Sequence, residues 1–169
     1  VALIGAGKFG SMFLAQARRT PGIHVVTVAD LAPQRARDSL ARTGWDADRY
    51  RARSLDEARK QGTTFVTDDA PATIASGAVE IAIDATGSPA AGIRHALACC
   101  EHRKHVVMGN GEADCLAGPL LARRAREAHA DARDRGAERF DRLHRHARDR
   151  PARRREAVDH PVDGHVPQV

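Results

Sequence analysis

The sequence predicts an α/β fold with a doubly wound parallel sheet over residues 1–128, followed by a tail over residues 129–169. Short apolar runs alternate five times with helical segments in the first 114 residues, as in a parallel sheet. The first run leads directly into a Gly-x-Gly-x-x-Gly turn, and the second ends on an acidic residue. A turn of this kind between a strand and a helix is typical of phosphate binding.

The glycine-rich turn follows the apolar run at residues 1–4. Its first glycine permits a tight turn, its second allows a pyrophosphate to approach the backbone, and its third lets helix and strand pack closely. The alternative is an ordinary strand-turn-helix corner, because glycine is common in turns. The candidate cofactor-binding residues of this turn are Gly5, Ala6, Gly7, Lys8, Phe9 and Gly10.

A helix is expected after Gly10, with Phe9, Met12, Phe13 and Ala17 at helical spacing. Thr20-Pro21-Gly22 would end this helix.

The β-branched run over residues 23–30 predicts a strand that is buried on both faces. Asp30 closes this run 20 residues after Gly10, where a carboxylate would bind the hydroxyls of an adenosine ribose. Capping of the next helix, near Pro33, is an alternative role, and one residue could do both.

The charges near Asp30 bear on the choice of cofactor. The carboxylate would repel a 2′-phosphate, which favours NAD over NADP. Arg35 and Arg37 follow closely, and either could bind a 2′-phosphate, although a solvated helix face is the better interpretation of Arg37. NAD or NADP therefore remains open, with a preference for NAD.

The middle of the chain continues the alternation. Helices are predicted over residues 33–42 and 55–60, and a strand over residues 63–67. Trp45 and Tyr50 lie in the polar loop between the two helices and are expected to pack as anchors.

The next helix contains Pro71 in its first turn. Asp68 and Asp69 precede this helix and are predicted to cap it.

A fourth strand is predicted over residues 79–84, and the loop after it would cross the cofactor crevice. Ala85, Thr86 and Gly87 are candidate cofactor-binding residues of this loop. Asp84 is interpreted as a strand-end carboxylate satisfied by nearby backbone N–H groups rather than as a catalytic group.

Ser88 and Pro89 predict the start of a helix that runs to about His102. A fifth strand over residues 105–108 would end at a loop over residues 109–114, in which Asn110 is a further candidate cofactor-binding residue. A helix is then expected over residues 116–135.

Composition limits the function classes. Residues 1–121 hold 14 Lys and Arg against 13 Asp and Glu, whereas residues 122–169 hold 13 against 9, so the basic charge belongs mostly to the end of the chain. Nucleic acid is therefore an unlikely partner for the α/β part. The three cysteines predict neither a zinc site nor a disulfide framework and favour a cytoplasmic protein.

No apolar run is long enough to cross a membrane, and no signal peptide is predicted. The chain starts without Met and directly on strand residues, so we expect that a preceding segment is missing or was removed.

Together these motifs resemble the homoserine dehydrogenase-like oxidoreductases, whose N-terminal domain is an NAD(P)-binding Rossmann fold. The subgroup most similar contains the 1-deoxy-D-xylulose 5-phosphate reductoisomerase-like enzymes, which often carry a C-terminal SAF-type domain. The resemblance covers about residues 1–128 and rests on the segments 1–11, 28–30, 84–87 and 104–114, which include Asn110, Glu112, Ala113 and Asp114.

The resemblance implies hydride transfer between a nicotinamide cofactor and a small carbonyl or hydroxyl substrate held by a second domain. It is also compatible with a homo-oligomer. Gly111 follows Asn110 where homoserine dehydrogenases usually have lysine, so no catalytic lysine can be assigned there. Catalytic residues stay unknown, and this chain alone is expected to bind cofactor weakly and to be nearly inactive.

The tail over residues 129–169 lacks the strand pattern of a substrate domain and is predicted to be disordered or loosely helical. One interpretation is a basic arm that binds nucleic acid. The other is a frameshift near residue 129, and the 24 Arg against 3 Lys of the chain favour it. No metal site is predicted from the tail histidines His129, His144, His146, His160 and His165.

Two other functions remain as alternatives. One is a non-enzymatic sensor of nicotinamide redox state that uses the basic tail to bind nucleic acid. The other is an NAD-binding subunit that another chain completes.

Overall fold

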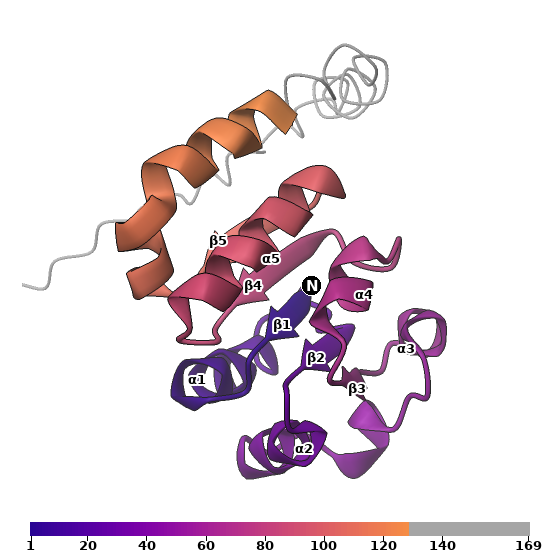
Figure 1. Ribbon diagram of the computed structural model, residues 1–169. Helices are drawn as coiled ribbons and strands as arrows, with labels where there is room; N and C mark the ends of the chain where they lie inside the picture. The colour runs from indigo at the N-terminus through magenta and orange to yellow at the C-terminus, as the bar shows by residue number, and fades with distance from the viewer. Residues whose placement is uncertain (129–169) are drawn as a thin grey trace, which may run out of the picture. The chain divides into compact units, whose positions relative to one another are not determined.

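The computed structural model describes residues 1–128, which form a five-stranded parallel sheet with helices on both faces (Figure 1). The strand order is β3-β2-β1-β4-β5, so the chain winds outward in both directions from β1. This arrangement is Rossmann-like and confirms the predicted doubly wound fold. The strands are β1 (Ala2–Ile4), β2 (Thr27–Ala29), β3 (Phe65–Thr67), β4 (Ile81–Asp84) and β5 (His105–Met108).

The connections between the strands are mainly helical. They comprise α1 (Lys8–Ala17), α2 (Pro33–Arg42), the 3-10 helix η1 (Ala47–Tyr50), α3 (Leu55–Gln61), α4 (Ala70–Ala75) and α5 (Pro89–Glu101). A further helix covers residues 111–128. No helix in the described part of the chain has the length and apolar character needed to cross a membrane.

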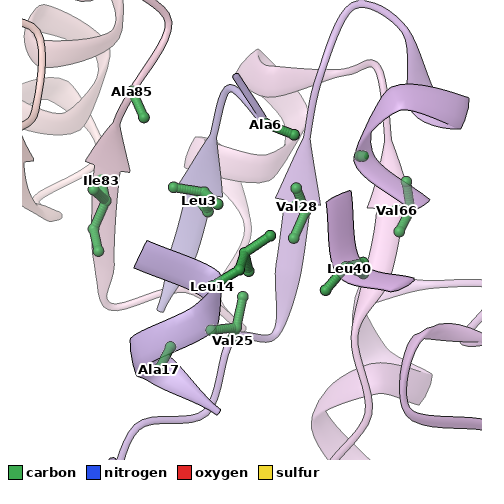
Figure 2. Packing of buried hydrophobic residues seen from close by; sticks show 11 residues of the cluster. Leu3, Ala6, Leu14, Ala17, Val25, Val28, Leu40, Val66, Ile83 and Ala85 are labelled. Carbon is green, nitrogen blue, oxygen red and sulfur yellow. The ribbon is translucent and has the colours of Figure 1, made fainter. Parts of the chain in front are cut away.

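Alternate residues of the strands build two hydrophobic layers, because successive side chains point to opposite faces of a sheet. On one face, Leu3, Val28 and Ile83 pack against Leu14 of α1 and Leu40 of α2 (Figure 2).

On the other face, Ile4, Ala29 and Ala82 pack against Ile74 of α4 and Cys99 of α5. Helices therefore cover both faces of the sheet.

Several predicted helix starts are confirmed by their hydrogen bonds. The Ser88 hydroxyl accepts from the Ala91 N–H at the start of α5, and Pro89 occupies the first turn. The Asp69 carboxylate accepts from the Ala72 N–H at the start of α4. Asp68 makes no such bond among the described residues, so its predicted capping role is wrong.

The predicted apolar face of α1 is partly wrong. Its buried positions are Gly10, Leu14 and Ala17, whereas Phe9 and Met12 are 49% and 59% exposed. Gly10 faces the sheet where the close approach of α1 to β1 leaves no room for a side chain, while Leu14 and Ala17 pack in the core from the same helix.

The element boundaries differ from the prediction in two ways. The strands are shorter, since β2 begins at Thr27 rather than near residue 23, although Val25 and Val26 are still buried. The residues expected to form a loop at 109–114 instead enter the last helix at residue 111. Asn110 makes this early start possible because its side-chain oxygen accepts from the Ala113 N–H.

The polar stretch after α2 contains η1 where a loop was expected. Trp45 packs against the core as predicted, and its indole N–H donates to the Leu14 carbonyl at 3.1 Å. The interpretations of the tail, and the last part of the helix expected over residues 116–135, lie outside the described residues.

Candidate functional site

A cleft of about 370 Å³ opens at the carboxyl ends of β1, β2 and β4. This is the end of a doubly wound sheet where ligands bind, because the chain leaves β1 in opposite directions to either side. The volume is within the range of small-molecule and cofactor sites. The cleft is mainly apolar, with a small number of polar groups at its edge.

The glycine turn forms one wall of the cleft. Gly5 has φ +96°, and a side chain there would collide with the backbone of Ala85 at the end of β4. The position of a Cβ at Gly7 is open, with no atom within 4 Å.

Gly7 is the N-cap of α1, and no side chain caps that end of the helix. The free N–H groups of the first turn and the helix dipole therefore favour an anion next to Gly7.

Asp30 lies at the end of β2 and holds the turn in place. Its Oδ2 accepts from the Ala6 N–H at 2.7 Å, and its Oδ1 accepts from the Ala32 N–H at 2.9 Å. Arg35 donates to both oxygens, through Nη2 to Oδ1 at 2.7 Å and through Nε to Oδ2 at 3.3 Å. One carboxylate thus links the glycine turn, the start of α2 and an arginine that is itself 56% exposed.

The loop after β4 is organised around Asp84, whose side chain is 1% exposed. Its Oδ1 accepts from the Thr86 hydroxyl at 2.9 Å, the Thr86 N–H at 3.3 Å and the Asn110 amide at 3.2 Å. Its Oδ2 lies 2.6 Å from Nδ1 of His95. The carboxylate is therefore held mainly by side chains, in addition to the backbone N–H that the sequence led us to expect.

The electrostatics of Asp84 follow from these contacts. Burial by itself would raise the pKa of the carboxyl group, but the hydrogen bonds from His95, Thr86 and Asn110 outweigh it and hold the pKa below its ordinary value. Asp84 is therefore an ionised acceptor at neutral pH.

The structure brings about half of the predicted site residues together in the cleft. Those that line it are Gly5, Gly7, Asp30, Arg35, Ala85 and Thr86. Those that do not are Ala6, Lys8, Phe9, Gly10, Gly87 and Asn110.

Two predicted residues that do not line the cleft form hydrogen bonds with residues that do. Ala6 orients Asp30 through its N–H. Asn110 is fully buried, and its amide donates to Asp84, Thr86 and the Ser88 carbonyl, so it supports the loop after β4.

Four polar residues in the lining had not been predicted as site residues: Asp68, Ser88, Arg94 and His95. They come from the β3–α4 connection and from the N-cap and middle of α5, and no local motif joins them. The one signal available in the sequence was the position of Arg94 and His95, which lie within the first two turns of the helix predicted to start at Pro89.

Neither a metal site nor a reactive thiol at Cys99 is indicated in the described part of the chain. Residues 1–128 contain no group of three or more His, Cys, Asp or Glu side chains that could hold a metal ion. Burial raises the pKa of the Cys99 thiol to about 12, which leaves it protonated and unreactive.

Comparisons with known proteins add no family to this description. No protein-family model matches the chain, and no curated protein sequence matches it. The chain is thus characterised by its Rossmann-like sheet topology, which is compatible with nucleotide binding.

Proposed function

We propose that residues 1–128 form an NAD(P)-binding domain of an oxidoreductase similar to the homoserine dehydrogenase-like enzymes and their 1-deoxy-D-xylulose 5-phosphate reductoisomerase-like subgroup. The observation that carries the proposal is that Gly7, at the N-terminus of α1, and Asp30, at the end of β2, line one cleft. In a doubly wound sheet these are the positions that bind the pyrophosphate and the adenosine ribose. NAD is favoured, because Asp30 would repel a 2′-phosphate.

The chain's own residues would divide the binding between them. The first turn of α1 would hold the pyrophosphate through backbone N–H groups, and Asp30 would accept from the ribose hydroxyls. Ala85 and Thr86 lie at the end of β4, where their small side chains leave a path for the rest of the dinucleotide.

A bound nicotinamide would supply hydride transfer to or from a small carbonyl or hydroxyl substrate. No catalytic residue is assigned, because groups that orient the substrate and move its proton would come partly from a substrate domain. We expect weak cofactor binding and little turnover from this chain alone.

Gly7→Ala is the sharpest test of this proposal. The added methyl group meets no atom of the protein, and φ −70° with ψ −158° suits alanine, so the fold should be unaffected. The methyl group would instead occupy the approach of the pyrophosphate and should weaken binding by about 1–3 kcal/mol, roughly fivefold to 150-fold.

The measurement is a fluorescence titration of the 169-residue chain with NADH and with NADPH. Gly77→Ala is the matched control, because a Cβ there also meets no atom within 4 Å and Gly77 lies outside the cleft. Asp30→Ala should also reduce binding. The proposal is wrong if neither dinucleotide binds, or if Gly7→Ala binds as well as Gly77→Ala.

A further inference from the structure

The cleft continues past Asp30 between the β3–α4 connection and α5. Its lining there includes Asp68, Ala70, Ala91, Arg94 and His95. If the ribose binds at Asp30, as the proposed function requires, the base attached to that ribose would enter this part of the cleft. Its apolar walls suit the faces of a purine, and its polar groups can contact the edge.

His95 is the polar group in this part of the cleft with a fixed arrangement. Its side chain is 14% exposed, and its Nδ1 lies 2.6 Å from Oδ2 of the buried Asp84. An ionised carboxylate can only accept hydrogen bonds, so Nδ1 must carry the hydrogen. In the neutral imidazole, Nε2 then has a free lone pair and acts as an acceptor.

Nε2 is open to a ligand. No residue in the part of the chain from 1 to 128 forms a hydrogen bond with it, and it is not among the buried unpaired polar atoms of that part. His95 lines the cleft, and the contact of its Nδ1 with Asp84 leaves Nε2 as the ring nitrogen that can meet a ligand there.

We propose that Nε2 of His95 accepts a hydrogen bond from the exocyclic amino group of adenine, and that the cleft therefore selects adenine over a 6-oxo purine. The proposal rests on the proposed function and adds specificity for the base. Adenine presents an N–H donor at its C6 substituent, whereas hypoxanthine and guanine present a carbonyl oxygen, which only accepts. Two acceptors facing each other in a partly dehydrated cleft would leave both unpaired.

Asp84 is a positioning residue in this proposal, because it fixes which nitrogen of His95 carries the hydrogen. Three donors from Thr86 and Asn110 hold its Oδ1, and Oδ2 is the atom that faces His95. In Asp84→Asn, the oxygen of the amide should stay with those donors and its NH2 should face His95. Nδ1 would then accept, and Nε2 would become a donor toward the cleft.

The test compares NADH with the reduced dinucleotide that has hypoxanthine in place of adenine. Both carry the same fluorescent reduced nicotinamide, so one titration assay measures both. The unmodified chain should bind NADH roughly tenfold more tightly, the effect of about one hydrogen bond. His95→Phe keeps an aromatic ring without the acceptor and should bind the two dinucleotides equally.

His102→Phe is the matched control, since His102 is exposed at the end of the same helix and lies outside the cleft. It should keep the preference for NADH. Asp84→Asn should reverse the preference in favour of the hypoxanthine dinucleotide. If this variant does not fold, the comparison of His95→Phe with His102→Phe decides alone.

The outcomes separate the two proposals. If the unmodified chain binds both dinucleotides equally well, base selection by His95 is wrong while cofactor binding stands. A preference for NADH that persists in His95→Phe also overturns it. If neither dinucleotide binds, both proposals are wrong.

Discussion

The pairing of Asp30 with Arg35 limits what the carboxylate can do. Each of its oxygens already accepts one backbone N–H and one N–H of the guanidinium group. A carboxylate oxygen has two lone pairs, so neither oxygen of Asp30 can accept a further hydrogen bond. A ribose diol can therefore bind Asp30 only when Arg35 moves away, and the exposed arginine would then be free to meet a 2′-phosphate.

Arg35→Ala should change the affinities for NADH and NADPH in opposite directions. NADH affinity should rise, because the ribose no longer competes with the guanidinium group for Asp30. NADPH affinity should fall roughly tenfold or more, through loss of a charged donor and exposure of the Asp30 charge to the 2′-phosphate. Parallel titrations with both dinucleotides measure the change.

Arg37→Ala is the control, because Arg37 is exposed on the same helix and lies outside the cleft. Equal losses of NADH and NADPH affinity in Arg35→Ala would contradict this role for the Asp30–Arg35 pair.

At the scale of elements, the contact between α1 and β1 depends on Gly10. A Cβ at this position would overlap the Gly5 carbonyl oxygen, which belongs to the rigid turn that closes β1. Gly10→Ala should therefore destabilise the protein by about 1–3 kcal/mol, as overpacking does, despite the better helix propensity of alanine. The midpoint of urea denaturation measures the change.

Gly7→Ala is the comparison for Gly10→Ala, because it adds the same methyl group in the same turn without touching another atom. Equal stability of the two variants would show that the close approach at Gly10 is not a constraint on the fold.

The fold could be predicted from the sequence because its signals are local. The glycine turn, Asp30, Ser88 with Pro89 and the apolar runs each lie within one or two elements. The buried face of α1 was predicted less well, because the pattern of large apolar residues pointed to Phe9 and Met12, whereas the buried positions are Gly10, Leu14 and Ala17.

The candidate site was predictable in part for the same reason. Gly7 and Asp30 belong to one strand-helix-strand unit with known spacing. Asp84 and His95 lie eleven residues apart in sequence, and their pairing depends on how α5 packs on β4. Asn110 donates to Asp84 because β5 pairs with β4 in a particular register, and hydrophobic periodicity in the sequence does not predict that register.

At the scale of the whole molecule, the Asp84 side chain connects β4 to three later segments of the chain. It ends β4, and its carboxylate binds Thr86 in the loop, His95 on α5 and Asn110 at the start of the last helix. Because the side chain is buried, loss of its charge would leave several donors without a good acceptor at once. The stability of the sheet's β4–β5 half should therefore depend on the ionisation of this one group.

The sign of the pH dependence follows from the pKa of Asp84, which is lower in the folded protein than the ordinary value of about 3.9. A group of this kind stabilises the fold fully above its unfolded pKa, and the contribution is lost as the pH falls through the folded pKa. Asp84→Asn should therefore be less stable than the unmodified chain at about pH 6, by on the order of 1–3 kcal/mol. The difference should shrink toward zero as the pH is lowered to about 3 and below.

Urea denaturation at a series of pH values measures this difference in stability, with Asp56→Asn as the matched control at an exposed carboxylate. A difference that stays constant over this range would mean that the charge of Asp84 contributes nothing, and that its hydrogen bonds stabilise the fold equally well from a neutral group.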